Sequence, residues 1–297
     1  MLRKILGSGY LFLVPAFVFF FCFILYPIIF VVAGSFFSWS TLSEMKFVAL
    51  NNYLEIMTDR VFRITMRNTV LWFFITIFTQ AGIGFFLAYI IEEKLVNGKL
   101  FFRTLYFIPV VTSVVVIAII WSNLYSPYNG PISNFLSGLG LPGPFNFLGD
   151  VKNVIFALIV VNIFEWTGWS MAMYIAGLSE ISLEMKEAAL IDGVTGFPLI
   201  WRIYLPVLSH VHKSLIMLGV IGSLQTFALI YSMTSGGPNS ASEMPGTYIF
   251  RTGFTMQRMG YASAISTVIL AFTLVVTVFQ MTVLKSGNLS IARGVDR

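Results

Sequence analysis

The chain has 297 residues, of which 57% are hydrophobic and only 10% are charged. A soluble domain carries about 25% charged residues, so this composition excludes a water-soluble globular protein and indicates one that lies in a bilayer. The net charge of +5 is spread over short segments, which argues against a nucleic-acid-binding protein. The single cysteine, Cys22, can form neither an internal disulfide nor a cysteine metal cluster.

Six apolar segments approach the roughly 20 residues that a helix needs to cross a bilayer. Backbone groups in lipid must be hydrogen-bonded internally, so these segments are expected as helices. The first is longer than the apolar core of a signal peptide, about 7–15 residues, and is predicted to be retained. The fold class is therefore all-α integral membrane, a single transmembrane domain over 1–297. Its spans are predicted at about 11–32, 70–91, 105–124, 154–178, 215–233 and 264–284.

An even number of spans places both termini on one side of the membrane. If that side is the cytoplasm, 11 of the 18 Lys and Arg residues face it, which is the bias that cytoplasmic loops show. The first outer loop, 35–69, is then predicted to carry a surface helix at 52–67, and the other outer connections are turns. The cytoplasmic basic residues would be Arg3, Lys4, Lys94, Lys99, Arg103, Lys186, Arg202, Lys213, Lys285, Arg293 and Arg297.

A polar segment at about 179–213 separates the fourth and fifth predicted spans and should form a helix–turn–helix on the cytoplasmic face. Ser182 is a cap-like residue before strong helix formers. Gly193 can adopt the left-handed conformation that stops a helix. Pro198 is tolerated in the first turn of a second helix, which ends near Pro206.

The motif of this segment is Glu-Ala-Ala at 187–189, Gly193, and Ile-x-Leu-Pro at 203–206. The two alanines would leave one helix face small enough to enter a groove on a partner, Glu187 could pair with a basic group there, and Asp192 could hold the turn. A docked rigid loop would move with its partner. The alternative is an ordinary amphipathic loop helix. We call the segment at about 179–213 the coupling loop. The predicted coupling residues are Glu187, Ala188, Ala189, Asp192, Gly193, Ile203, Leu205 and Pro206.

The motif resembles the EAA signature of the membrane subunits of binding-protein-dependent ABC importers. Further blocks, at 13–16, 26–27, 102–109, 234–238 and 260–264, resemble the permeases of the carbohydrate-uptake family. The similarity covers nearly the whole chain and is greatest to the maltose-type first permease, without its large extra periplasmic domain. It implies a MetI-like six-helix permease fold with a cytoplasmic coupling helix, in a bacterial or archaeal cytoplasmic membrane.

The resemblance also implies partners. These are a second homologous permease, two ATPase subunits, an extracytoplasmic solute-binding protein and a sugar. ATP and Mg²⁺ would be bound by the ATPase subunits, so this chain would hold no cofactor or metal and would not be an enzyme. The outer turn Gly236, Gly237 and Pro238 would be a plain turn or lie near the outer gate or the binding protein. His210 and His212 lie beside the coupling loop without a third metal ligand nearby in sequence.

The fourth predicted span is the least lipid-like. A charge at the bilayer centre costs roughly 2.5–3.5 kcal/mol on insertion scales, so Glu165 should face a cavity or a partner. Aromatic faces beside hydrogen-bonding groups suit sugars, and residues of the fifth span could complete such a site. The predicted substrate residues are Asn162, Glu165, Trp166, Trp169 and Met173, which share one helix face, with Gln225, Phe227 and Tyr231. Alternatively, Trp166 and Trp169 belong to an interfacial belt and Glu165 serves packing.

Other functions stay open at this stage. An importer permease for a non-sugar solute such as glycerol phosphate is one, although no basic cluster lies within the spans. A passive channel or ion-coupled carrier is another, but ion coupling usually needs several intramembrane ionisable groups, and Glu165 is almost alone. A membrane enzyme would need a motif, and the sequence has no Walker A, HExxH or convincing Ser–His arrangement.

Overall fold

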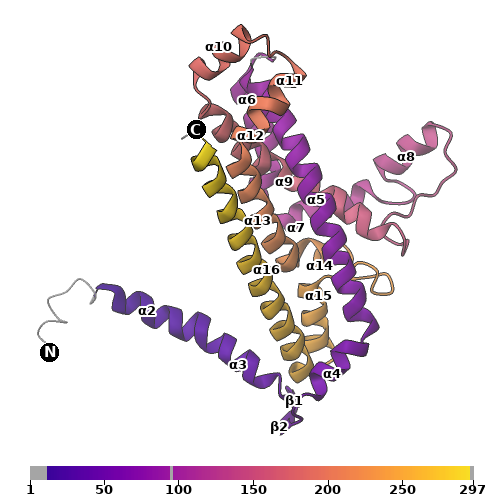
Figure 1. Ribbon diagram of the computed structural model, residues 1–297. Helices are drawn as coiled ribbons and strands as arrows, with labels where there is room; N and C mark the ends of the chain where they lie inside the picture. Colours follow the sequence, from indigo (N-terminus) through magenta and orange to yellow (C-terminus); the bar gives the residue numbers. More distant parts are fainter. Residues whose placement is uncertain (1–11, 94–95, 295–297) are drawn as a thin grey trace, which may run out of the picture. The chain divides into compact units, whose positions relative to one another are not determined.

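The computed structural model describes residues 12–93 and 96–294, apart from the side chains of 283–294 (Figure 1). It divides into two compact units, Met1–Phe62 with Tyr248–Leu274 and Arg63–Thr247 with Val275–Arg297; the single-domain organisation stays a prediction. Leu11, the first residue of the first predicted span, lies outside the described residues. So do four of the basic residues on which the predicted orientation depends, Arg3, Lys4, Lys94 and Arg297, and the side chains of two more, Lys285 and Arg293.

In the first unit, the first predicted span is a continuous helical run of α2 (Val14–Phe20), the π-helix η2 (Phe21–Leu25) and α3 (Tyr26–Gly34). Pro15 stands in the first turn of α2, where a missing N–H is tolerated, whereas Pro27 lies inside the continuous run, directly after the π-helical turn. The run is 21 residues long, and none of the most apolar part is buried. Its length and exposed apolar surface suit a lipid environment.

The first outer loop differs from the all-helical prediction. A hairpin of β1 (Phe37–Ser40) and antiparallel β2 (Ser43–Phe47) precedes α4 (Asn51–Thr58). The predicted surface helix at 52–67 is wrong in its extent, because α4 stops at Asp59 and α5 (Arg60–Glu92) already begins there. The Asp59 carboxylate accepts hydrogen bonds from the backbone N–H groups of Val61 at 2.7 Å and Phe62 at 3.2 Å, which is an N-cap.

The same carboxylate joins α4 and α5 to the other segment of the first unit, which holds residues 248–250 of α15 (Pro245–Phe250), the π-helix η4 (Arg251–Thr255) and the start of α16 (Met259–Gly294). The hydroxyls of Tyr248 and Tyr261 both donate to Asp59. Burial opposes ionisation of Asp59, but these donors and the two N–H groups hold its pKa below the usual value. Arg258 donates to both carboxylate oxygens of Glu55, at 2.8 and 2.6 Å.

In the second unit, α9 (Val154–Ser179) matches the fourth predicted span, but the third and fifth are not the single helices predicted. Segment 105–124 is divided between α6 (Lys99–Val111) and α7 (Val114–Leu124), bent by 97° at the extended residues Thr112 and Ser113. Segment 215–233 is α13 (Ser209–Gln225) and α14 (Ala228–Met233), separated by extended Thr226. The apolar composition of a segment indicates whether the segment is long enough to span a membrane. It does not indicate where the backbone ψ angle changes from helical to extended.

Four described helices are long and apolar enough to cross a membrane, or up to six if each bent pair is one span. The bent pairs are α6 with α7, and Phe197–Val207 with α13. The loop before α13 consists of α10 (Leu183–Ile191), α11 (Phe197–Leu199), the π-helix η3 (Ile200–Tyr204) and α12 (Leu205–Val207). In Figure 1, α10 and α11 lie at one end of the second unit. The outer connection between α7 and α9 contains the short helix α8 (Pro131–Gly138).

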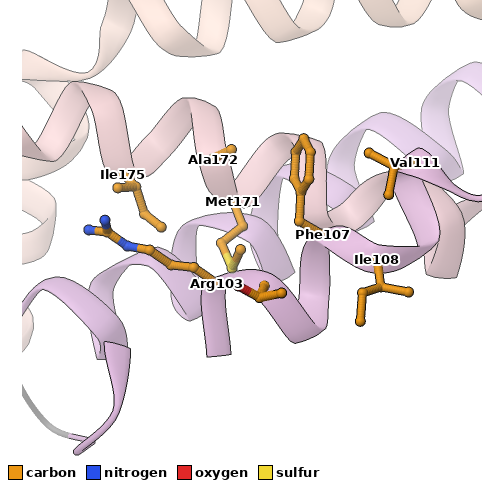
Figure 2. A pocket seen from close by; sticks show the side chains of 8 residues that line it. Arg103, Phe107, Ile108, Val111, Met171, Ala172 and Ile175 are labelled. Carbon is orange, nitrogen blue, oxygen red and sulfur yellow. The ribbon is translucent and has the colours of Figure 1, made fainter. Parts of the chain in front are cut away.

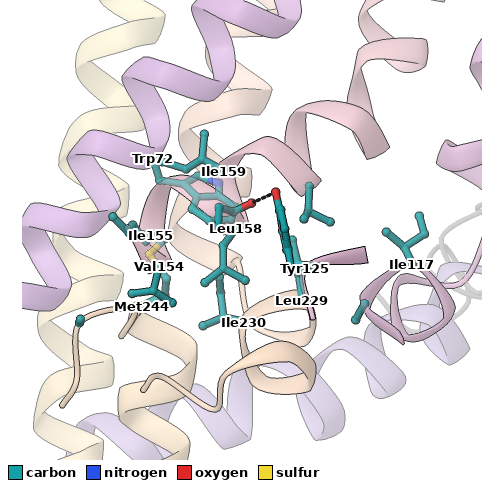
Figure 3. Packing of buried hydrophobic residues seen from close by; sticks show 14 residues of the cluster. Trp72, Ile117, Tyr125, Val154, Ile155, Leu158, Ile159, Leu229, Ile230 and Met244 are labelled. Carbon is teal, nitrogen blue, oxygen red and sulfur yellow. Dashed lines mark hydrogen bonds between the residues drawn. The ribbon is translucent and has the colours of Figure 1, made fainter. Parts of the chain in front are cut away.

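Two clusters of buried hydrophobic side chains hold the second unit together. The first surrounds Trp72 and Leu158 and includes Tyr125, whose hydroxyl donates to Ala157 O at 3.1 Å (Figure 3). The second joins α5 and α9 to Tyr204 and Leu208 of the loop at the end of the unit. Close backbone approach adds to this packing: a Cβ atom on Gly168 of α9 would lie 2.0 Å from the carbonyl oxygen of Tyr106 in α6.

Candidate functional site: a cavity and a coupling loop

A cavity of about 540 Å³ lies within the second unit, between α5, α9, α13 and the start of α14. Six of the predicted substrate residues line it, whereas two do not. Met173 packs against the second buried cluster, one turn beyond the cavity. Tyr231 stacks on Phe227 with ring centroids 5.2 Å apart. The predicted residues that line the cavity are Asn162, Glu165, Trp166, Trp169, Gln225 and Phe227.

The α9 wall of this cavity combines buried polar groups with half-open indole rings. Glu165 is only 5% exposed, and Trp166 and Trp169 are 41% and 39% exposed. Gln80 of α5 donates from Nε2 to both the backbone O and the side-chain Oδ1 of Asn162, each at 3.1 Å. This contact fixes the Asn162 amide beside the cavity. Glu165 lines the cavity and does not face lipid, as expected from the cost of placing an ionisable group in the hydrocarbon core.

Residues of α5 complete the wall, and they were not predicted from the sequence. Trp72, Thr76 and Gln80 all line the cavity. Their spacing of four places them on one helix face, and two of them are polar residues inside an apolar span. That combination is visible in the sequence and could have identified α5 as a second wall.

The lining supports one kind of ligand chemistry. Amide and hydroxyl groups can exchange hydrogen bonds, and the two indole faces present apolar area, which together suit a ligand with both hydroxyls and C–H faces. Among the described residues that line the cavity, Glu165 is the one ionisable side chain and none is Lys or Arg. The site is therefore suited to an uncharged polar molecule.

The predicted helix–turn–helix is present at the end of the second unit. Ser182 accepts a hydrogen bond from Met185 N at the start of α10. Gly193 has φ of 71°, and the N–H groups of Gly193 and Val194 donate to Leu190 O and Ala189 O at 3.1 and 2.8 Å. This is a Schellman motif, the helix stop for which a left-handed glycine is suited. Asp192 contributes its backbone N–H, which donates to Ala188 O at 3.0 Å.

The predicted coupling residues divide between the surface and the interior of the chain. Glu187, Ala188 and Pro206 are exposed, whereas Ile203 and Leu205 are half-buried. Ala189 is 4% exposed and packs within this chain. Around them the loop exposes large apolar side chains, namely Leu183, Leu190, Ile191, Phe197 and Trp201.

One carboxylate connects both halves of this loop to α5. Glu93 follows the last residue of α5, and its Oε1 accepts hydrogen bonds from Lys186 Nζ and from the Tyr204 hydroxyl, each at 2.8 Å. Burial acts against ionisation of Glu93, but Lys186 and Tyr204 hold its pKa below the usual value. This link was not predicted from the sequence, although Glu92 and Glu93 are the only adjacent acidic pair in the chain.

The outer turn at Gly236, Gly237 and Pro238 folds over a buried carboxylate. Gly236 is buried with φ of 85°, and a Cβ atom there would lie 2.5 Å from the Glu243 carboxyl group. Ser242 Oγ donates to Gly237 O at 2.5 Å, and Thr247 donates to Glu243 Oε2 at 2.8 Å. The turn is thus a compact, internally bonded element of the second unit.

A second cavity, of about 410 Å³, lies between α6 and α9 (Figure 2). Phe107, Val111 and Ile175 contribute to a mostly apolar lining, and Arg103 lies at its edge. The Arg103 guanidinium donates to Glu92 at the end of α5. This hydrogen bond uses part of the donor capacity of Arg103 within the chain, so the cavity offers chiefly apolar contact.

The two histidines beside the coupling loop make contacts within the chain. His212 contacts the Tyr174 hydroxyl through Nδ1 at 2.7 Å and Leu205 O through Nε2 at 3.2 Å. His210 lies 3.4 Å from the Glu180 carboxylate. Within the described part of the chain, His, Cys, Asp and Glu side chains form no group of three that could hold a metal ion.

Long apolar helices, a polar cavity among them and an exposed helical loop at one end define a multi-pass membrane transport protein. The chain belongs to the family described as binding-protein-dependent transport system inner membrane components, whose model matches residues 80–285.

Individual relatives agree with this assignment over most of the chain. A probable ABC transporter permease protein, YurN of Bacillus subtilis, is 37% identical over 94% of this chain and 96% of its own length. The trehalose/maltose transport system permease protein MalF of Thermococcus litoralis is 32% identical over 94% and 93%. A chain in the crystal structure of a bacterial ABC transporter involved in the import of the acidic polysaccharide alginate has a TM-score of 0.82 at 23% identity, covering 93% of this chain and 94% of that one. The fold is therefore that of an ABC importer permease.

Proposed function

We propose that this chain is the permease subunit of an ATP-driven carbohydrate importer, in which it forms half of the translocation pathway. The family assignment supports the transport role, and the name of the Thermococcus litoralis relative supports a sugar. The observation that carries the choice of cargo is the cavity, where Trp166 and Trp169 stand beside Asn162, Gln80 and Gln225. Aromatic faces and amide groups together match the C–H faces and hydroxyl edges of a sugar.

The charge of the cavity favours a neutral sugar over an anionic one. Phosphate and carboxylate ligands are typically held by Arg or Lys, and neither is among the described residues of the cavity lining. The one acidic side chain of the lining, Glu165, supplies no positive charge that could offset that of an anion. Glycerol phosphate and acidic sugars are therefore less well supported as cargo for this chain.

The energy for transport would come from other subunits. In our proposal, two ATPase subunits bind ATP and Mg²⁺, a second homologous permease completes the pathway, and an extracytoplasmic solute-binding protein delivers the sugar. This chain is non-catalytic, and both of its termini lie in the cytoplasm. The exposed apolar side chains of the coupling loop, among them Ile191 at 85% and Trp201 at 60%, support a partner at that end, because such patches mark interaction sites.

Motion would reach the pathway through the loop. ATP binds the closed ATPase pair more tightly than the open pair, and this differential affinity drives the conformational change. A loop docked on the ATPases would move with them as a rigid body. The cavity would then open alternately to either side of the membrane.

Reconstitution of the complete importer in liposomes tests this proposal. We expect uptake of radiolabelled trehalose or maltose, or of another neutral sugar in a panel, that needs both internal ATP and the binding protein. Glycerol 3-phosphate and an alginate oligosaccharide serve as anionic comparisons. Uptake by this chain alone without ATP would replace the proposal with a channel or an ion-coupled carrier, and uptake of the anions alone would overturn the assignment of a neutral sugar.

A further inference from the structure

The end of α5 carries two neighbouring carboxylates that make different contacts. Glu92 accepts a hydrogen bond from Arg103 of α6 and lies 3.5 Å from the Lys99 ammonium. Glu93 instead reaches the coupling loop through Lys186 and Tyr204. One carboxylate therefore secures the turn from α5 to α6, whereas the other secures the loop.

The Glu93 contact spans both halves of the coupling loop. Lys186 belongs to α10, before the Gly193 turn, and Tyr204 belongs to η3, after it. The Tyr204 ring is fully buried, 6.0 Å from the ring of Tyr89 in α5 between centroids, and the Lys186 ammonium lies 5.6 Å from the Tyr204 ring centroid. A single oxygen atom thus joins α5 to α10 and to η3.

Helix α10 itself has little other attachment to the long helices, although Ile181, just before it, belongs to the second buried cluster. Of the residues in α10, all of which are described, only Ala189 is buried. The second half is held independently, because Tyr204 and Leu208 belong to the second buried cluster. Loss of the Glu93 charge should therefore loosen α10 while leaving the rest of the loop folded.

Helix α5 leads from this contact to the cavity. Gln80 lies thirteen residues before Glu93, a distance of about 20 Å along a helix at 1.5 Å per residue. At that point α5 contributes Trp72, Thr76 and Gln80 to the cavity wall, and Gln80 holds Asn162 in place. A displacement of α5 therefore moves the cavity wall that α5 forms. It also moves Gln80, which holds Asn162 in the wall formed by α9.

We propose that Glu93 is a positioning residue that transmits movement of the coupling loop to α5 and so to the cavity. This inference rests on the proposed function, because it requires an ATPase that moves the loop. The Lys186 ion pair carries the first half of the loop, and the Tyr204 hydroxyl keeps the carboxylate oriented between the two halves.

A distance measurement in the complete importer tests the link directly. With Cys22 replaced by Ser, spin labels are placed at Glu184 in α10 and Phe86 in α5, both of which are exposed. In the wild-type background the label distance should stay constant when ATP is bound, because α10 and α5 move together. In Glu93→Gln the distance should change or its distribution should broaden with ATP.

Transport provides a second measurement. Glu93→Gln and Lys186→Met should each lower the sugar transported per ATP hydrolysed by about threefold or more, with sugar affinity unchanged. The reciprocal exchange Glu93→Lys with Lys186→Glu should restore part of the loss, which a merely destabilised loop would not show. Glu92→Gln is the matched control, because Glu92 contacts α6 and should leave both the ratio and the label distance unchanged.

The outcomes separate the two proposals. A wild-type importer without ATP-driven uptake refutes the proposed function. If wild-type uptake is ATP-driven but Glu93→Gln keeps the constant label distance and the transport ratio of the wild-type protein, or if Glu92→Gln changes both as much as Glu93→Gln does, the role of Glu93 is overturned.

Discussion

The cavity and the coupling loop of the second unit are stabilised by different kinds of contact. The cavity has polar side chains set on helices that are themselves fixed by buried apolar clusters. The loop has an apolar, exposed tip, and its first helix is attached chiefly through Lys186 and Glu93. Changes in the cavity lining should therefore alter ligand affinity and have little effect on coupling. Changes in the loop should alter coupling and have little effect on ligand affinity.

The largest expected effect is on the frame of the cavity. Gly168→Ala would place a Cβ atom 2.0 Å from the Tyr106 carbonyl oxygen, so α6 and α9 must separate. Overpacking of this kind costs about 1–3 kcal/mol, and we expect at least that loss in the free energy of unfolding in detergent. Gly82→Ala in α5 is the control, because nothing lies within 4 Å of a Cβ there. Equal effects of the two substitutions would contradict the close approach.

The next effect concerns the exposed loop surface. Glu187→Ala should lower the transport rate by about tenfold or more, because truncating one member of a desolvated charge pair at an interface costs about 2 kcal/mol or more. Sugar affinity should not change. Glu184→Ala in the same helix is also exposed and serves as the matched control. Normal coupled turnover of Glu187→Ala would remove this residue from the mechanism.

The coupling loop was predictable from the sequence because its signals are local. A cap at Ser182 and a helix stop at Gly193 act over a few residues, and both are present. The cavity was predicted only in part, since helical spacing identified Asn162 and Glu165 on α9, but their neighbour Gln80 stands 82 residues away in sequence from Asn162. Which helix faces α9 is decided by packing, and no pattern within one span encodes it.

The breaks within the spans were missed for a related reason. Hydropathy is the same whether Thr112 and Thr226 are helical or extended, so 105–124 and 215–233 were each predicted as one helix although both are divided. Glu93 contacts Lys186 and Tyr204, which lie 93 and 111 positions further along the chain. An acidic pair in the sequence indicates that partners exist, but only the fold assigns Arg103 to one carboxylate and Lys186 to the other.

A smaller effect should separate the two regions most clearly. Trp166→Ala should weaken binding of the transported sugar about threefold to tenfold, in line with about 0.5–1.5 kcal/mol for an aromatic contact, and leave ATPase stimulation intact. Trp201→Ala, on the coupling loop, should do the reverse. Isothermal titration and ATPase assays on the same preparations check both. An unchanged sugar profile in Trp166→Ala and in Glu165→Gln would place the binding site elsewhere.

The smallest expected effect is that of pH on the contact between Glu93 and the coupling loop, which should be constant over most of the range. Because the pKa of Glu93 is lowered in the folded protein, its contribution to stability is complete above the ordinary value of 4.5 and is lost only as pH falls through the lowered pKa. The charged groups that act on this carboxylate are Lys186 and Lys99. The distance between labels at positions 184 and 86 should therefore hold from pH 8 to about 5 and change only in stronger acid.

Glu93→Gln should abolish that acid transition, because the amide does not titrate. A transition in the wild-type protein between pH 6 and 7 that is absent in Glu93→Gln would mean that burial outweighs the two hydrogen bonds and that Glu93 becomes protonated in this range. The carboxylate would then lack the charge that holds Lys186, and α10 would move separately from α5. The pH profile thus tests, on one titrating group, whether the coupling loop is attached to the cavity wall by an ion pair.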